Sequence, residues 1–126
     1  MLGLLLLLCL SGFFVPAALA QQVVPPLKKE FLDSAYIALP SEKGAYYRRE
    51  TEYKDSTAAV VRVYFLNGKL RLTSQYSHLR KGIPDGIHEA WFDNGQLQFH
   101  AVYKEGRRDG ELRTYYENGQ LKRRET

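Results

Sequence analysis

The sequence has almost no sulfur-containing residues, and this scarcity limits how the protein can be held together. Its 126 residues include one methionine and one cysteine, Cys9. Cys9 lies inside the apolar segment at the start of the chain, directly after Leu8, which is too early for a lipid-anchor cysteine. Beyond that segment the chain can form neither a disulfide nor a thiolate metal site. We therefore expect the rest of the chain to be one small domain that depends on its own packing.

Long apolar runs are also missing, except at the beginning. Residues 2–15 are almost entirely apolar, Pro16 interrupts the run, and Ala18 and Ala20 place small side chains two positions apart. A short apolar run followed by a breaker and an Ala-x-Ala box is typical of a secretory signal peptide, whereas a bilayer crossing takes ~20 residues. We expect cleavage after Ala20 and export to the periplasm or cell envelope. Because no Lys or Arg precedes the run, an uncleaved membrane anchor is the alternative.

Residue patterns that carry chemistry are absent as well. The three histidines, His78, His88 and His100, lack the spacing of a metal site. No serine sits in a Gly-x-Ser-x-Gly turn, and the glycines do not form a phosphate-binding loop. We therefore expect no enzymatic activity, with no catalytic residue, no cofactor and no metal.

Positive charge is present but not concentrated. Lys and Arg outnumber Asp and Glu by 18 to 14, giving a net charge of +4, and all of these charges follow residue 20. The basic residues form short groups spread along the chain. The simplest interpretation is a solvated basic surface. The more specific one is attraction to anionic lipid head groups or an anionic envelope polymer. Nucleic-acid binding is not expected, because it needs a focused basic patch.

Three Asn-Gly dipeptides reveal an internal repeat. Two adjacent aromatic residues precede each dipeptide, and a Leu follows each at the same distance. Such self-similarity indicates a repeat architecture, and Asn-Gly between strand-forming residues predicts a β-hairpin. The expected turn is the two-residue type I′ turn, in which both central residues have positive φ. The dipeptides, spaced by 27 and 24 residues, are Asn67-Gly68, Asn94-Gly95 and Asn118-Gly119.

A two-residue turn also predicts which side chains share a face of each hairpin. Phe92 would face Leu97, and Trp91 would face the residue after Leu97 on the opposite side of the sheet. Tyr64 and Tyr115 occupy the position of Trp91 in the other units. Packing within each unit is the plain interpretation of these aromatics.

The segments between the hairpins complete the expected organisation. Asp85-Gly86 and Asp109-Gly110 are predicted to be turns that link one hairpin to the next. We divide the chain into a signal peptide at 1–20, a linker with degenerate strands at 21–58, and repeats at 59–85, 86–109 and 110–126, the last one incomplete. Within 21–58, residues 36–39 and 43–50 are the expected strands, and Tyr46-Tyr47 is a decayed form of the aromatic pair.

The repeated unit resembles the MORN-repeat variant found in bacteria. It reads Gly-x-x-x-x-(Trp/Tyr)-(Phe/Tyr)-x-Asn-Gly-Gln-Leu, followed by Tyr-x-x-Gly-x-x-Asp-Gly. Residues 86–110 are the best copy, 110–126 are a good but incomplete one, and 59–76 depart from the pattern because Ala59 replaces the leading Gly. The resemblance covers about half the chain. It implies an all-β fold, an elongated antiparallel sheet of tandem hairpins, and a scaffold or binding role without catalysis.

Two groups of proteins with this repeat imply different roles. In TonB-type energy transducers, a signal or anchor and a Tyr-rich stretch resembling residues 43–53 precede the repeats and a periplasmic C-terminal domain. This sequence has no such domain, which implies a truncated or stand-alone relative. Other proteins with the repeat are labelled antitoxins, which neutralise a toxin by direct binding in the cytoplasm. Because residues 1–20 favour export, the antitoxin role is the alternative.

The expected function is therefore that of an exported module that binds a protein partner. A candidate binding face combines aromatic residues with Arg, both of which are frequent at the centres of protein interfaces. The last strand would be an exposed edge, which makes self-association by strand pairing a further expectation. The candidate binding residues are Tyr64, Trp91, Tyr115, Arg107 and Arg108.

Overall fold

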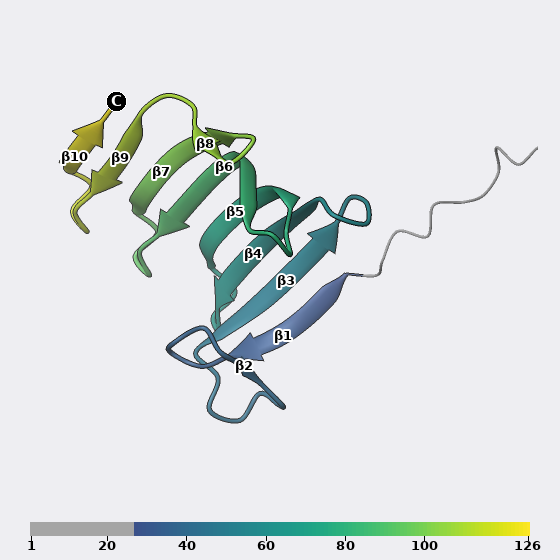
Figure 1. The fold of residues 1–126 in the computed structure, drawn as a ribbon. Helices are drawn as coiled ribbons and strands as arrows, with labels where there is room; N and C mark the ends of the chain where they lie inside the picture. The colour runs from purple at the N-terminus through teal and green to yellow at the C-terminus, as the bar shows by residue number, and fades with distance from the viewer. Residues whose placement is uncertain (1–26) are drawn as a thin grey trace, which may run out of the picture.

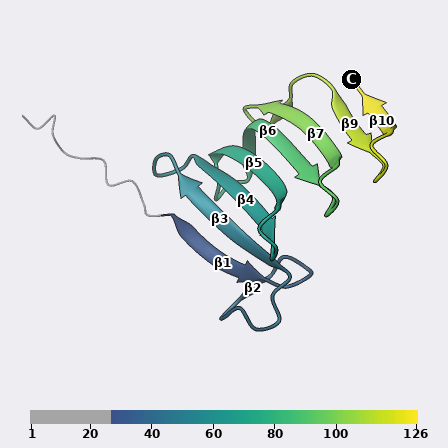
Figure 2. The same cartoon turned by 180° about the vertical axis from the view of Figure 1, so that it is seen from behind.

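The computed structural model describes residues 27–126, which form one antiparallel β-sheet without any helix among them. Figure 1 shows the strands side by side in a single curved layer, with β1 and β2 at one end and β10 at the other. The view from behind in Figure 2 shows no second layer over either face. The predicted fold class, an elongated antiparallel sheet of tandem hairpins, is confirmed. The predicted signal peptide lies outside the described residues.

The sheet contains ten strands, most of which pair with their neighbours in sequence. The spatial order is β10-β9-β7-β6-β5-β4-β3-β1-β2, and the short β8 pairs only with β7. Most pairings are therefore local in sequence, and the exceptions are β1 with β3 and β7 with β9. The strands are β1 Lys28–Leu32, β2 Ala38–Leu39, β3 Tyr47–Tyr53, β4 Ala59–Phe65, β5 Leu70–His78, β6 Ile83–Trp91, β7 Leu97–Lys104, β8 Arg107–Arg108, β9 Leu112–Tyr115 and β10 Leu121–Glu125.

One face of the sheet, which we call the inner face, contains every fully buried side chain of the described residues. The strand register places these side chains on one side, because alternate residues of a strand point to the same face. They are small or medium-sized side chains. The rest of the sheet is half-buried, as expected where no second layer covers it. The buried residues are Leu32, Thr51, Ala59, Val63 and Ala101.

The opposite face, which we call the outer face, carries a row of charged residues across the middle of the sheet. Cations and carboxylates alternate along much of this row. The Arg62 guanidinium also lies 2.8 Å from a carboxylate oxygen of Glu52, the next residue of β3 on this face. Exposed pairs of this kind each stabilise a fold by ~1 kcal/mol or less. The row therefore keeps the face hydrated more than it holds the fold together. In register, it contains Lys29, Glu50, Arg62, Thr73, Glu89, His100, Arg113 and Arg124.

The three Asn-Gly turns share a geometry that differs from the prediction. In the first turn, the Gly68 amide donates to the Phe65 carbonyl (2.9 Å) and the Phe65 amide donates to the Lys69 carbonyl (2.9 Å). Gly68 has a φ of 89°. Asn67 does not have a positive φ, because in the described part of the chain Tyr36 and Glu105 are the non-glycine residues that do. This is a three-residue loop, a type I turn followed by a glycine bulge, and the type I′ prediction is wrong.

Asparagine is used in these turns for its side-chain oxygen. Asn67 Oδ1 accepts a hydrogen bond from the Lys69 amide at 3.0 Å. Asn94 and Asn118 accept the equivalent bond at 2.9 and 3.0 Å. Asparagine side chains commonly bond to the backbone two residues on, which closes the turn while the Asn φ stays negative. The need for positive φ therefore falls on the glycine alone.

A second bulge follows each turn and changes which residues share a face. Trp91 pairs with Leu97, not with the residue after it, and the register then shifts by one residue. The same shift occurs after Tyr64–Leu70 and after Tyr115–Leu121. The predicted pairing of Phe92 with Leu97 is therefore wrong, and the Leu of each repeat lies on the outer face. The unpaired extra residue at the shift is Arg71 in the first repeat, Gln98 in the second and Lys122 in the third.

The links between hairpins also differ from the prediction. Asp85-Gly86 is not a turn, because both residues lie inside β6, where Gly86 adopts a φ of 114°. The chain reverses earlier, where the Gly82 amide donates to the Leu79 carbonyl at 3.0 Å. Asp109-Gly110 lies in the bend between β8 and β9. A two-residue turn with positive φ at both positions does occur, between β7 and β8 at Glu105 (49°) and Gly106 (83°).

The N-terminal region contains more sheet than the sequence predicted. Residues 36–39 and 43–50 overlap β2 and β3, but β1 at Lys28–Leu32 was not expected. β3 pairs with β4 in continuous register, with Tyr47 opposite Phe65. Tyr47 begins β3 and lies beside Phe65 on the same face, whereas the second aromatic of a repeat stands directly before its turn.

Candidate binding surfaces

The three aromatics predicted to form a binding face lie in one stripe on the outer face, close to the Asn-Gly turns. Each pairs in register with the Leu that follows its turn. Most members are half-buried, and Leu121 is 44% exposed. The Arg48 guanidinium carbon lies 5.2 Å from the centre of the Tyr64 ring at one end. We call this set the outer stripe; it consists of Tyr64, Leu70, Trp91, Leu97, Tyr115 and Leu121.

The two predicted arginines do not join the outer stripe. Arg107 and Arg108 form β8 and pair with Lys104 and Tyr103, at the end of β7 far from the Asn-Gly turn. Arg108 Nη1 lies 2.9 Å from Glu125 Oε2. The structure therefore separates the arginines from the aromatics, because the hairpin at Glu105-Gly106 reverses the chain before β8.

A second row of aromatics, on the inner face, was not predicted as a site. It consists of the second aromatic of each pair and begins beside the N-terminal strands. The rings of Tyr36 and Tyr47 are stacked, with centroids 4.7 Å apart and an interplanar angle of 2°. The rings of Tyr47 and Phe65 lie 5.9 Å apart. This row was not predicted from the sequence because the register shift in each repeat, which brings a further side chain to the row, was not expected.

Two of the bulge residues place cations beside these inner aromatics. The Arg71 guanidinium carbon lies 5.9 Å from the Phe65 ring centre, and Lys122 Nζ lies 5.6 Å from the Tyr116 ring centre. Arg71 Nη1 also donates to Gln98 Oε1 at 2.7 Å. Cation–π contacts at exposed sites stabilise by ~0.5–1 kcal/mol. The bulge therefore equips the inner face with polar groups that a regular strand would direct outward.

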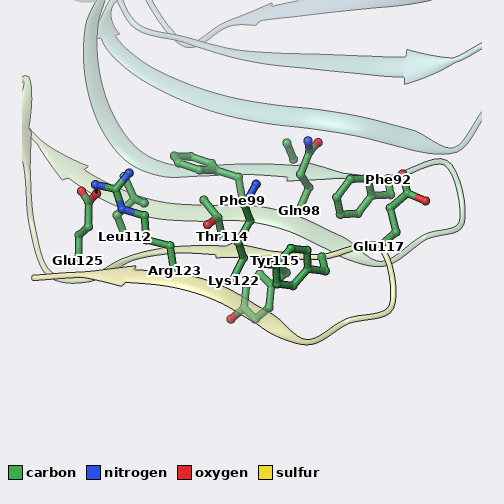
Figure 3. Close-up of a pocket in the computed structure, with 12 residues that line it drawn as sticks. Phe92, Gln98, Phe99, Leu112, Thr114, Tyr115, Glu117, Lys122, Arg123 and Glu125 are labelled. Atoms are coloured by element: carbon green, nitrogen blue, oxygen red, sulfur yellow. Dashed lines mark ion pairs between the residues drawn. The ribbon is translucent and has the colours of Figure 1, made fainter.

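A hollow of about 1020 Å³ opens on the inner face over β6, β7, β9 and β10. We call it the inner hollow. Figure 3 shows Phe92, Tyr115 and Glu117 at its turn end and Leu112, Arg123 and Glu125 at the other end. Its floor is largely apolar and its rim on β10 is charged. Tyr115, which ends β9, borders this hollow as well as belonging to the outer stripe. The hollow is lined by Ala90, Phe92, Gln98, Phe99, Leu112, Thr114, Tyr115, Tyr116, Glu117, Lys122, Arg123 and Glu125.

The histidines pack within the sheet. His88 Nε2 lies 3.0 Å from the Gln75 carbonyl oxygen, and its ring is edge-on to the rings of Tyr76 and Tyr103. His100 Nδ1 lies 3.2 Å from Glu89 Oε1. Within residues 27–126, no three His, Cys, Asp or Glu side chains are grouped to hold a metal ion. In the same range, no helix is long and apolar enough to span a membrane.

Comparison with known families supports the repeat assignment for the C-terminal part of the chain. A family model described as MORN repeat variant matches residues 84–105 and 108–126. The first segment contains the turn between β6 and β7, and the second contains the turn between β9 and β10. The β4–β5 hairpin has the same turn but lies outside the match. No curated protein and no solved structure matches the chain. Residues 84–126 are thus similar to two consecutive MORN-variant repeats.

Proposed function

We propose that this protein is an exported, non-enzymatic module that binds a protein partner in the cell envelope. The main support is the single uncovered layer of the described sheet, which leaves apolar and aromatic side chains accessible on both faces. Monomeric proteins rarely expose extended apolar patches without an interaction role. The outer stripe and the inner hollow are the two surfaces that such a partner would use.

The similarity to MORN-variant repeats supports the binding role. MORN repeats are generally non-catalytic modules that bind proteins or membrane lipids. The apolar run and Ala-x-Ala box of residues 1–20 support export. The Tyr-rich stretch before the repeats is the basis for a relationship to TonB-type transducers.

Cell fractionation combined with intact mass measurement tests the location. We expect a soluble envelope protein that lacks residues 1–20. A full-length species in the envelope membrane would indicate a retained anchor. A full-length cytoplasmic species would overturn export and favour the alternative role, an antitoxin-like protein that neutralises a toxin by direct binding.

Cross-linking in intact cells tests the binding role. A photo-reactive residue at Trp91 samples the outer stripe, one at Thr114 samples the inner hollow, and one at Arg80 samples an exposed turn as a control. We expect a discrete cross-linked protein from at least one of the first two positions. Cross-linking to lipid alone, or equal products from all three positions, would contradict a protein-binding module.

A further inference from the structure

We infer that β10 and the inner hollow form one docking site for an extended, acidic segment of the partner protein. The segment would add to the sheet as a further strand beside β10. This inference rests on the proposed binding function and assigns it a place and a partner chemistry.

The backbone of β10 provides the first part of the site. In the described residues, β10 pairs with β9 and has no strand on its other side. An edge strand presents unpaired amide and carbonyl groups that can bond to an incoming extended chain. Leu121, Lys122, Arg123 and Arg124 are all exposed, so such a chain could reach the edge.

The charge of β10 selects the occupant. Three of its five residues are basic and one, Glu125, is acidic. Arg123 forms an ion pair with Glu125, and Arg124 Nε lies 3.3 Å from Glu111 Oε1. Lys122 lies over the face of the Tyr116 ring. The edge therefore keeps an excess of positive charge, which an acidic segment complements.

The same charge disfavours a second copy of this chain as the occupant. Two β10 strands paired with each other would bring Lys and Arg side chains opposite one another, and like charges in cross-strand positions destabilise a sheet. The free part of β1 at the other end of the sheet begins with Lys28 and Lys29, so head-to-tail pairing meets the same obstacle.

The inner hollow provides the second part of the site. Leu112 and Thr114 of β9 form its floor next to β10, and Phe99 of β7 lies one strand further away. Alternate residues of an added strand would lie on the inner face beside Arg123 and Glu125, at the β10 rim of the hollow, and the residues between them would lie on the outer face beside Arg124. The site therefore fits a segment that alternates apolar and acidic residues.

A labelled heptapeptide of alternating Glu and Leu, beginning and ending with Glu, is a direct probe of this site. Its binding to the protein purified from expressing cells can be followed by fluorescence anisotropy. We expect saturable binding that weakens by at least roughly tenfold in the double variant K122E/R124E, because the new acidic side chains on β10 repel the acidic ligand. The control variant K43E/K81E has the same change in net charge at exposed positions far from β10, and we expect it to bind like the unaltered protein. Circular dichroism checks that both variants remain folded.

Two altered peptides separate strand pairing from charge attraction. A peptide with an N-methyl group on every amide has no N–H to donate to β10, and a Lys-Leu peptide reverses the charge. We expect neither to bind measurably. Equal binding of either peptide, or equal loss of binding in both protein variants, would overturn the inference.

The cellular cross-linking experiment keeps this inference separate from the proposed function. If the partner is captured equally well by the K122E/R124E variant, the docking site is wrong while the binding function stands. If the purified protein sediments as a dimer that K122E/R124E dissociates, a second copy occupies the edge and the inference is also wrong. Loss of capture in K122E/R124E and retention in K43E/K81E is the result we expect.

Discussion

The side-chain nitrogen of Asn94 donates a hydrogen bond to the backbone carbonyl oxygen of Glu117 at 2.9 Å, joining the turn of one hairpin to the turn of the next. Asn94 Oδ1 meanwhile accepts from the Gln96 amide at 2.9 Å within its own turn. One side chain therefore shapes its own turn and aligns the following repeat. Lys69 makes a longer contact of the same kind, with its Nζ 3.4 Å from the Asp93 carbonyl oxygen.

Substitutions of Asn94 should separate these two bonds. Asn94→Asp keeps the acceptor and removes the donor, so we expect a loss of about 0.5–1.5 kcal/mol in the free energy of unfolding. Asn94→Ala removes both bonds and should cost about twice as much. Asn118→Asp is the matched control, since Asn118 accepts the bond within its turn and the charge change is the same. Urea unfolding measures all three, and equal effects of N94D and N118D would contradict the link between turns.

A side chain at Gly86 should be destabilising, for two reasons that can be measured separately. Its φ is 114°, and a Cβ atom there would lie 1.9 Å from Gln75 Oε1. We expect Gly86→Ala to cost more than the ~1–3 kcal/mol typical of backbone strain. Gly110→Ala is the control, because Gly110 has a similar φ of 100° with no atom within 4 Å of an added Cβ.

A double variant tests the steric part of the Gly86 prediction. Gln75→Ala removes the two nearest clashing atoms, Oε1 and Cδ, together with the acceptor that lies 3.1 Å from the Ile87 amide, and leaves the Cβ atom at 3.0 Å. In a double-mutant cycle, G86A should therefore cost less in the Q75A background than in the unaltered protein. Thermal or urea unfolding gives the free energies of unfolding of the unaltered protein, the two single variants and the double variant. If the two single effects simply add, the Gln75 side chain moves out of the way of the new methyl group without cost.

The repeat organisation could be predicted because its signals are local and recur. Asn-Gly flanked by paired aromatics identifies a hairpin from a few neighbouring residues, and three copies confirm one another. The N-terminal strand β1 had no such signal, since the turn that joins it to β2 contains no Asn-Gly pair and most of its pairing is with β3. Pairing between distant segments leaves little trace in a single sequence.

The candidate site was less predictable, because it depends on details of register. The bulge after each turn moves Leu97 to the face of Trp91 and gives the inner face Gln98. A one-residue shift reverses the face of every side chain that follows it, so a small error in turn type misplaces a surface. The inner hollow could not be inferred from the sequence for this reason.

The stability contributed by Glu52 should depend on pH. Hydrogen bonds from Lys54 and Arg62 lower the pKa of Glu52 to about 2, from an ordinary value of 4.5. Because the folded-state pKa lies below that of the unfolded chain, the contribution is complete above pH 4.5. It is lost as the pH falls from there through about 2. The pKa values of Glu30, Asp55 and Glu125 are also lowered, so the whole fold should weaken in acid.

The variant E52Q isolates this contribution. We expect the difference in unfolding free energy between the unaltered protein and E52Q to be constant near neutral pH and to shrink on acidification. The difference should also fall in high salt, because the groups are exposed. The control is E42Q, since Glu42 lies in an exposed bend and forms none of the ion pairs of the described residues. A difference between the unaltered protein and E52Q that grows toward acidic pH would reverse the assigned sign.

Arg108 should hold the end of β10, whereas its neighbour Arg107 should not. Arg108 Nη1 lies 2.9 Å from Glu125 Oε2, and its Nη2 donates to the Thr126 carbonyl at 3.2 Å. The hydrogen bond from Arg108 is also the largest cause of the lowered pKa of Glu125. Arg108→Ala should therefore accelerate amide hydrogen exchange in residues 121–125 by a few-fold, as expected for an ion pair worth ~1 kcal/mol or less. Arg107→Ala removes the same charge from the same short strand, and we expect it to leave these amides unchanged. Equal acceleration in both variants would mean that general loss of positive charge, and not the Arg108–Glu125 contact, governs the edge strand.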